Sequence, residues 1–259
     1  MSDDVQTTDF KDRMIRLGRW LESPAGRPLI KAERRCIDFQ LRTVFGYYAC
    51  QTSPALHYNW LENSQTGHHF AVTPFKLECS GLSQMVCDPY FWPVEPGSLD
   101  LVLLHHTLDI AESPHRLLSE AASTIISNGK LLVVGFNPLS LSFIARWLIP
   151  ERVRAFQGTR FISVRRLRDW LTLLGFRTEQ VHYGAYTAPL DRLFKGISAE
   201  FIEQRCDHWR LPIGSFYSIL ATREDHGITP IQKAWPRVKN RLVGRPIARP
   251  SAGRYGESS

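Results

Sequence analysis

Two short apolar runs, Leu99 to Leu104 and Lys130 to Phe136, stand out from the hydrophobic pattern of the chain. Both runs are rich in Leu and Val and show little alternation with polar residues. This pattern is typical of strands that are buried on both faces of a parallel sheet. Between the two runs, apolar residues recur at helical spacing, at Leu117, Leu118, Ala121, Ala122, Ile125 and Ile126. The pattern therefore predicts a strand–helix–strand crossover unit.

The connecting helix has recognisable signals at both ends. Ser113 is a favoured N-cap, and Pro114 suits the first helical position, where the missing N–H costs nothing. Asn128 and Gly129 follow the apolar stripe, and both residues tolerate the left-handed backbone that ends many helices. We therefore expect the helix to begin after Ser113 and to end at Asn128-Gly129.

Weaker patterns predict the remaining elements. Two helices are expected first, from Phe10 to Glu22 and from Pro28 to Phe45. Further strands are expected at Tyr47 to Gln51, His68 to Thr73, Met85 to Cys87, Phe176 to Tyr183 and Ser215 to Thr222. Further helices are expected at Ala55 to Asn63, after Asn137-Pro138, and after the N-cap Ser163.

These patterns divide the chain into three parts. Residues 1–46 hold the N-terminal helices, and residues 47–223 hold an α/β domain. Residues 224–259 form a basic tail without periodicity, rich in Pro, Gly, Arg and Ser, which is typical of disorder. Within the domain, the segment from Gly184 to Gly214 is longer than a hairpin connection needs. It is either a cap over a site or an ordinary packing helix.

Composition narrows the class of protein. A chain of 259 residues that is 43% hydrophobic suits one α/β domain with extensions. No apolar run approaches the roughly 20 residues that span a bilayer, and the polar, acidic N-terminus does not resemble a secretory signal. The five cysteines form no Cys-x-x-Cys pair, which favours free thiols in a reducing cytoplasm over a disulfide framework.

The positive charge is concentrated in the tail. Residues 224–259 contain seven Lys or Arg and three acids, so the tail carries +4 of the formal net charge of +7. The domain itself is therefore only mildly basic. The tail, with Trp235, could contact RNA or another polyanion, or it could be a solvated appendage, which is the simpler interpretation.

Specific short motifs surround the fourth and fifth predicted strands. The fourth strand follows Cys87-Asp88-Pro89, Trp92-Pro93 and Pro96-Gly97-Ser98-Leu99-Asp100, and it leads into His105-His106-Thr107-Leu108-Asp109. Asn128-Gly129-Lys130-Leu131 opens the fifth strand. In order and spacing these motifs resemble the class I S-adenosylmethionine-dependent methyltransferases, especially the type 11 methyltransferase domain. The resemblance is strong over residues 84–137 and weaker from about residue 40 to 222.

The resemblance implies a fold, an activity and a cofactor. The implied fold is a Rossmann-like, seven-stranded α/β sheet, mostly parallel, with a terminal antiparallel hairpin. The implied activity is methyl transfer from S-adenosylmethionine to an unknown acceptor. Asp88 and Pro89 would contact the adenine of this donor, and His105 would flank its ribose or methionine part. Gln51 and Ser53 stand where the family has its donor-binding loop, and His106 could be a general base if its pKa is near neutral.

Two features of the family's donor site are missing from the sequence. The loop after the first strand reads Gln51-Thr52-Ser53-Pro54-Ala55, without the glycines that let the backbone approach the donor. Val72-Thr73-Pro74 offers no acid to hold the ribose hydroxyls. The alternative function is therefore a non-catalytic binding or scaffold protein that kept the fold and lost the cofactor site. A deep cleft beside Ser53, Asp88 and His105 would favour the enzyme.

The histidine pairs do not predict a metal site. In His105-His106 successive side chains are expected to point in different directions, and the sequence places no third ligand near them. His68-His69 is expected to be structural. We therefore expect no bound metal.

Overall fold

A computed structural model of the protein describes residues 2–76, 82–140, 155–186 and 212–224. These residues belong to the unit Met1–His226, and a second unit, Gly227–Ser259, lies outside them. The helix expected after Asn137-Pro138, most of the segment from Gly184 to Gly214, and the tail with Trp235 also lie outside the described residues. The predictions made for these segments therefore stay predictions.

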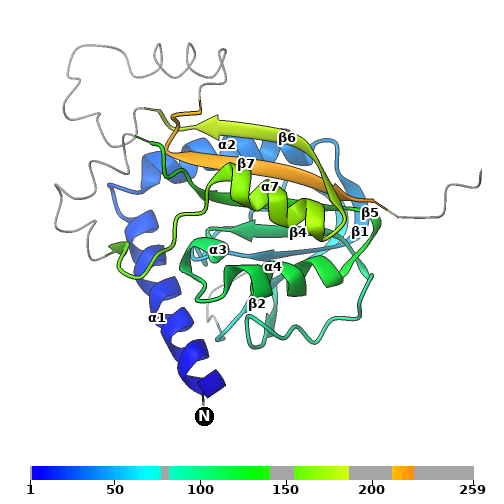
Figure 1. Ribbon diagram of the computed structural model, residues 1–259, viewed down its shortest axis with the longest axis horizontal. Coiled ribbons are helices and arrows are strands. Elements are labelled where there is room, and N and C mark those ends of the chain that lie inside the picture. The colour runs from blue at the N-terminus through cyan, green and yellow to red at the C-terminus, as the bar shows by residue number, and fades with distance from the viewer. Residues whose placement is uncertain (1, 77–81, 141–154, 187–211, 225–259) are drawn as a thin grey trace, which may run out of the picture. The chain divides into compact units, whose positions relative to one another are not determined.

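The domain is built on a seven-stranded sheet with the order β3-β2-β1-β4-β5-β7-β6 (Figure 1). All neighbouring strands are parallel except β7, which is antiparallel to both β5 and β6. This arrangement confirms the predicted fold. The strands are β1 Phe45–Thr52, β2 Gln65–Thr73, β3 Ser83–Val86, β4 Leu99–His105, β5 Ile125–Phe136, β6 Phe176–Gly184 and β7 Phe216–Arg223.

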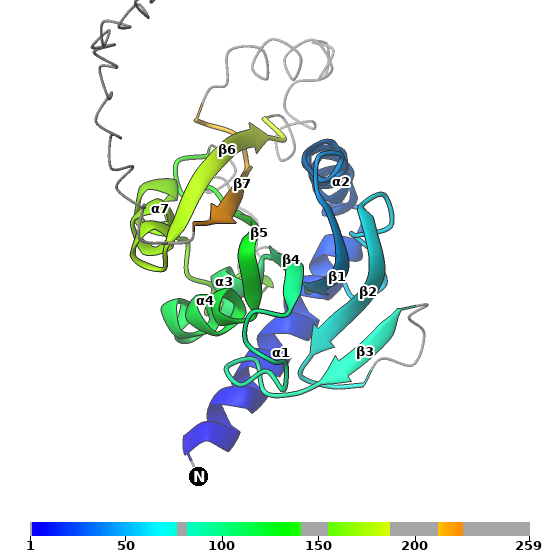
Figure 2. The ribbon, with the colours of Figure 1, turned by 90° about the vertical axis from the view of Figure 1, so that its right-hand side faces the viewer.

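Helices cover both faces of the sheet. In Figure 2, α3, α4 and α7 lie on one face, and α2 lies on the other. The helices are α1 Ser2–Glu22, α2 Arg27–Leu41, α3 Thr107–Ile110, α4 Pro114–Ser123 and α7 Val164–Leu173. Both predicted N-cap positions are confirmed, but only one side chain forms a cap: Ser113 precedes α4 without a capping hydrogen bond, and the Ser163 hydroxyl accepts the Arg166 N–H at the start of α7. None of the described helices has the length and apolar character that crossing a bilayer requires.

Helix α1 runs across the carboxyl-terminal ends of the central strands (Figures 1 and 2). The ring of Phe10 meets that of Tyr90, which follows β3, and Arg13 donates to the carbonyl of Ile110 at the end of α3. Gly18 lies so close to Pro54, which follows β1, that a Cβ at this position would overlap the Pro54 carbonyl oxygen. The edge of the sheet at which this fold class binds ligands is therefore covered by the N-terminal helix.

The connection between β1 and β2 contains no helix, so the helix predicted from Ala55 to Asn63 is wrong. The Gln51 side chain fixes this loop instead, because its amide donates to the carbonyl of Tyr58 and its oxygen accepts the N–H of Trp60, both at 2.8 Å. Trp60 and Leu61 are fully buried. In a helix, the Tyr58 carbonyl and the Trp60 N–H would form hydrogen bonds with other backbone groups. Here they are bound by the side chain of Gln51 in β1.

Helix α4 is shorter than the sequence predicted. It ends at Ser123, and β5 begins two residues later at Ile125. Asn128 does adopt a left-handed backbone, with φ of 62°, but it lies within β5, where the register against β4 shifts between Leu99 and Leu101. The Asn128-Gly129 signal therefore marks an irregularity in a strand.

Candidate functional site

A cluster of buried polar side chains lies at the carboxyl-terminal end of β4. His105 is the last residue of this strand, and His106 follows it with φ of 53°, in the left-handed region. This backbone turn brings the two rings to the same side, with centroids 4.5 Å apart. The expectation that successive histidines would point apart is therefore wrong at this position.

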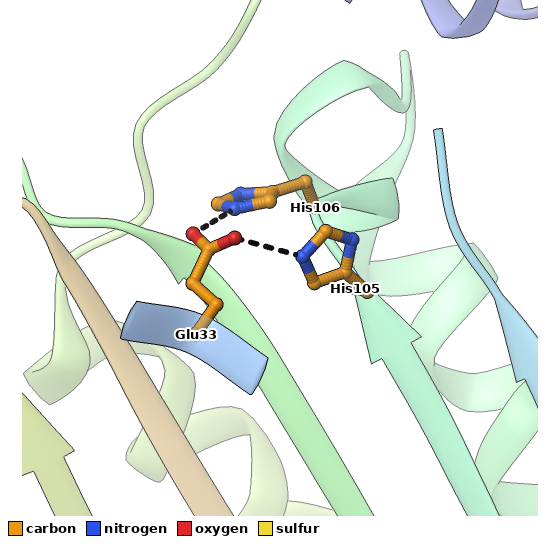
Figure 3. Close-up of side chains that lie close together, drawn as sticks. All are labelled: Glu33, His105 and His106. Atoms are coloured by element: carbon orange, nitrogen blue, oxygen red, sulfur yellow. Dashed lines mark hydrogen bonds and ion pairs between the residues drawn. The ribbon is translucent and has the colours of Figure 1, made fainter. Parts of the chain in front are cut away.

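Glu33 of α2 joins the two histidines, as Figure 3 shows. Its Oε2 lies 3.1 Å from Nε2 of His105, and its Oε1 lies 2.8 Å from Nε2 of His106. All three side chains are fully buried. Sequence reasoning missed Glu33, although a signal existed: it occupies an apolar stripe on α2 between Ile30 and Ile37, a position where a charged residue is rarely buried without a partner.

Each histidine has a further partner on its other ring nitrogen. Nδ1 of His105 lies 2.7 Å from the Ser53 hydroxyl, and Nδ1 of His106 lies 2.9 Å from Oδ2 of Asp109. The same carboxylate oxygen of Asp109 accepts the backbone N–H of Phe136 at 3.0 Å. The polar cluster thus ties α2, β1, β4 and β5 together at one point.

The partners of Ser53 determine where the proton of His105 lies. The Ser53 hydroxyl oxygen accepts the N–H of Ala55 and the indole N–H of Trp60, each at 3.1 Å. Both of its lone pairs are then in use, so its O–H donates to Nδ1 of His105. His105 consequently carries its proton on Nε2 and donates it to Glu33.

His106 is in the opposite state. Both of its nitrogens face carboxylate oxygens, one from Glu33 and one from Asp109, so both nitrogens donate. Burial alone would lower the pKa of His106, but these two carboxylates outweigh it and raise the pKa to about 9. His106 is therefore an imidazolium at neutral pH.

The other pKa values agree with this arrangement. Burial, together with the neighbouring charge of His106, lowers the pKa of His105 to about 4. Burial would raise the pKa of Glu33, but the charge of His106 and hydrogen bonds from both histidines lower it to about 2. Burial raises the pKa of Asp109, which the hydrogen bond from His106 opposes. One buried cation is thus held between carboxyl groups.

Aromatic rings enclose the cluster. Trp60 packs on the His105 ring with centroids 4.1 Å apart, and Phe136 stacks on the His106 ring at 3.8 Å. Ser53 is 4% exposed, and both histidines are 0% exposed. Ser53 and His105 are therefore closed to solvent in this conformation.

Glu33, His105 and His106 also have the composition of a metal site. Their ligand atoms lie within 4.8 Å of one another, so Glu33 supplies the third ligand that the sequence did not place. A metal needs the Nε2 lone pairs of both histidines, and in the described hydrogen-bond network both Nε2 atoms carry protons. The cluster as it stands is therefore a proton-holding group.

Asp88 and Pro89 lie elsewhere along the same edge, just after β3. In the sheet, β2 and β1 separate β3 from β4. Oδ1 of Asp88 accepts the N–H of Tyr90 at 2.7 Å, so Asp88 begins a turn after β3. Asp88 is half-buried and Pro89 is buried. Of the six predicted site residues, the structure brings Ser53, His105 and His106 together, and Gln51 supports their loop.

Two buried oxygens beside the cluster make no hydrogen bond with any described residue. They are Oγ1 of Thr107 and Oδ1 of Asp109. Buried polar atoms are normally paired, so such atoms indicate a place for water or for a ligand group. The segment after β4 therefore contains two oxygens, one in Thr107 and one in Asp109, that could accept a further hydrogen bond. The polar atoms of the Ser53 and His105 side chains, in contrast, are already hydrogen-bonded within the protein.

Comparison with known sequences gives one relative and no family. No family model matches the chain. The uncharacterized protein YafS of Escherichia coli strain K12 is 29% identical over 157 residues, which are 61% of this chain. The match spans 64% of the length of YafS, just under two thirds.

Comparison with solved structures concerns the fold. A SAM-dependent methyltransferase from Thermotoga maritima, described as a possible histamine N-methyltransferase, matches with a TM-score of 0.57 and 17% identity, over 80% of this chain and 94% of that chain. SAM-dependent methyltransferases from Archaeoglobus fulgidus and Mesorhizobium loti match with TM-scores of 0.51 and 0.50, at 18% and 14% identity. They cover 73% and 78% of this chain, and 94% and 100% of their own. The chain therefore has the class I fold of SAM-dependent methyltransferases.

Proposed function

We propose that this protein is an S-adenosylmethionine-dependent methyltransferase of the type 11 kind, with an acceptor that is not yet identified. The observation that carries this proposal is the sheet order β3-β2-β1-β4-β5-β7-β6 with a single antiparallel strand, β7. In open α/β sheets, ligands bind outside the carboxyl ends of the strands, near the point where the strand order reverses. That point lies between β1 and β4, beside Ser53 and His105.

Asp88 and Pro89 are the proposed adenine contacts. The bond from the Tyr90 N–H fixes the Asp88 carboxylate in a turn at the end of β3. A carboxylate in this place can accept a hydrogen bond from the exocyclic amine of adenine, and the backbone near Pro89 can follow the edge of the ring. When bound, S-adenosylmethionine supplies a methyl group already activated by its sulfonium, so the protein must chiefly hold donor and acceptor in line.

The proposed roles of Gln51, Ser53 and His105 require movement. The donor can touch Ser53 and His105 only if Trp60 or α1 shifts, because Trp60 packs on His105 and is bonded to Ser53, and α1 packs on the neighbouring Pro54. Gln51 is 3% exposed and supports the Trp60 loop, so we propose that it acts by positioning that loop. The arrangement disfavours His106 as a general base, because both of its nitrogens already hold protons.

Calorimetric titration with S-adenosylmethionine and S-adenosylhomocysteine tests the donor site. The variant Asp88→Asn keeps an oxygen that can accept the Tyr90 N–H but removes the charge. We expect it to weaken donor binding by about tenfold, because a hydrogen bond to a charged group is typically worth about 1.5–3 kcal/mol and Asp88 is partly exposed. The matched control is Glu95→Gln, an exposed acid in the same loop.

Three results of this titration have distinct meanings. Weakened binding in Asp88→Asn alone supports the adenine site. Equal binding in both variants rules out the Asp88 contact but leaves a donor-binding protein. Absence of binding to the wild type at millimolar donor rules out the methyltransferase proposal.

The second candidate is a non-catalytic protein that uses this fold as a binding module. A specific observation favours it: Ser53 and His105 are buried and bonded to Trp60 and Glu33, in the place where a donor would contact β1 and β4. The loop after β1 also lacks both glycines and a following helix. Failure of the wild type to bind the donor, with an intact fold by circular dichroism, is the expected outcome for this candidate.

Location and macromolecular partners follow from weaker observations. Among the described residues, Cys36, Cys50 and Cys87 form no disulfide, and we propose a reducing compartment such as the cytoplasm on this ground. Contact with nucleic acid would involve the tail after residue 224, which lies outside the described residues. We propose a solvated tail first, and contact of the tail with nucleic acid only as the second alternative.

A further inference from the structure

A pocket of about 430 Å³ opens between α2 and the carboxyl-terminal end of β6. Sites for small molecules commonly have volumes of about 300–1,000 Å³. None of its lining residues belongs to the buried cluster of Glu33, His105 and His106. Its side chains with aromatic rings or charge are Arg35, Phe39, His182, Tyr183, Tyr186 and Phe216.

The walls of this pocket are aromatic. Phe39 projects from α2 and is 56% exposed, which is unusual for a large apolar side chain unless it meets a partner. Its ring meets the His182 ring edge-to-face, with centroids 5.8 Å apart and an interplanar angle of 78°. Phe216 of β7 lines the same space and lies on the same face of the sheet as His182, whereas the Tyr183 side chain turns to the opposite face, towards Arg168 of α7. Aromatic walls favour a flat ring, which can stack on one wall and meet another by its edge.

The pocket has one cationic group that lacks a partner. Arg35 lies one helical turn before Phe39 on α2 and forms no hydrogen bond or ion pair with any described residue. The adjacent Arg34, in contrast, is bound to Asp38 and Glu62. No Asp or Glu is among the described residues that line the pocket. The Arg35 guanidinium can therefore bind a carboxylate or phosphate with two parallel hydrogen bonds.

The floor of the pocket is held in a fixed shape. Ala185 has φ of 56°, in the left-handed region that side chains rarely adopt, and it is buried. The Ser215 hydroxyl holds this turn by donating to the Ala185 carbonyl at 2.6 Å. Gly214 packs directly on Gly184, where a Cβ would overlap the backbone. Strained backbone of this kind is concentrated at ligand sites, where it presets the position of the side chains around it.

We propose that this pocket binds a small planar aromatic anion, with its ring against Phe39 and His182 and its anionic group on Arg35. The shared chemistry is a flat ring that carries one carboxylate or phosphate. This proposal goes beyond methyl transfer, and it holds whether or not the protein binds S-adenosylmethionine.

The test is a calorimetric titration of the full-length protein with 2-naphthoate. Its neutral match is 2-naphthamide, and its saturated match is decahydronaphthalene-2-carboxylate. We expect saturable 1:1 binding of 2-naphthoate and at least about threefold weaker binding of each match, because one lacks the charge and the other the flat ring. Absence of saturable binding, or equal binding of the amide, overturns the proposal.

Paired variants locate the binding. Arg35→Gln is expected to weaken 2-naphthoate binding about three- to tenfold, whereas Lys31→Gln, an exposed cation on the same helix outside the pocket, is not. Phe39→Ala is expected to weaken binding similarly, whereas Phe45→Ala, which removes a 68% exposed ring elsewhere, is not. All four side chains are exposed, so the folds should remain intact, which melting temperatures would check. Binding unchanged in Arg35→Gln or Phe39→Ala overturns the proposal.

Discussion

His105 and His106 are neighbours in the sequence but hold their protons differently. Ser53 donates to His105 and leaves it neutral, whereas Glu33 and Asp109 both accept from His106 and keep it charged. The difference arises from three partners in separate parts of the chain, Ser53 after β1, Glu33 on α2 and Asp109 on α3, not from the histidines themselves. This is why the cluster requires both carboxyl groups: each one compensates a buried imidazolium that would otherwise be costly.

The charge of His106 predicts a dependence of stability on pH. Its pKa is about 9 in the folded protein against an ordinary value of 6.5, so its contribution to stability is complete below pH 6.5 and is lost as the pH rises through 9. We expect the free energy of unfolding to fall by roughly 2–3 kcal/mol over this range. Urea unfolding at pH 6, 7.5 and 9 measures it.

Variants assign this dependence to the cluster. His106→Gln should be less stable than the wild type near neutral pH and should lose most of the decline towards pH 9. His68→Gln, which changes an exposed histidine, should keep the decline. If His106→Gln declines as steeply as the wild type, His106 does not carry the charge.

At the residue scale, the sequence indicated half of the candidate site. Ser53, His105 and His106 could be singled out because they follow predicted strands, where ligand sites of parallel sheets lie. Glu33 and Trp60 could not be placed, because each reaches the cluster through a helix or loop whose path depends on tertiary packing. Nor could the left-handed backbone of His106 be foreseen, since non-glycine residues adopt it only when the surrounding structure requires it.

At the scale of elements, strong patterns were predictive and short ones were not. The predicted strand from Leu99 to Leu104 falls within β4, because a run buried on both faces has few alternatives. The helix predicted from Ala55 to Asn63 does not form, because Gln51 binds the backbone of the loop and Trp60 is drawn into the core. A local propensity is weak compared with such contacts.

The contact between α1 and the β1–β2 loop predicts the effect of Gly18→Ala. Alanine favours a helix by roughly 1 kcal/mol over glycine, but here its Cβ would overlap the Pro54 carbonyl oxygen. Displacing backbone typically costs 1–3 kcal/mol, so we expect a net loss of stability of about 1 kcal/mol and a fall in melting temperature of about 2–4 °C. Differential scanning calorimetry measures the change.

The control for this substitution is Gly67→Ala in β2. A Cβ at Gly67 would approach only the Tyr47 backbone, at an ordinary contact distance of 3.4 Å, so little change is expected. A Gly18→Ala variant that is more stable than the wild type would show that α1 does not press on the loop.

At the scale of the whole molecule, the sequence predicted the class of sheet but not the contacts that close it. The seven strands could be found one by one from their apolar patterns. Pairs such as Gln40 of α2 with Ser218 of β7 could not, because nothing local to either residue specifies a partner 178 positions away. The resemblance to a known family therefore predicted the topology of the sheet, whereas the contacts between side chains could be learned only from the structure.

The tail, residues 224–259, is predicted to contribute little to the stability of the domain. Its Pro/Gly/Arg composition and lack of an apolar stripe indicate that the domain folds without it. We expect a chain truncated after Glu224 to melt within a few degrees of the full-length protein, as measured by circular dichroism. A large fall would mean that the region around Trp235 packs on the domain.

The place of β7 in the sheet has a consequence for synthesis. This strand is the last of the seven in the sequence, yet it lies between β5 and β6, and α2 packs against it through Gln40 and Ser218. Ile37 and Leu41, which are fully buried in the finished protein, therefore leave the ribosome long before the strand that helps to cover their helix exists. A nascent chain in this state exposes apolar surface, which makes it prone to aggregate. The seven-stranded sheet can therefore be completed only after β7 has emerged.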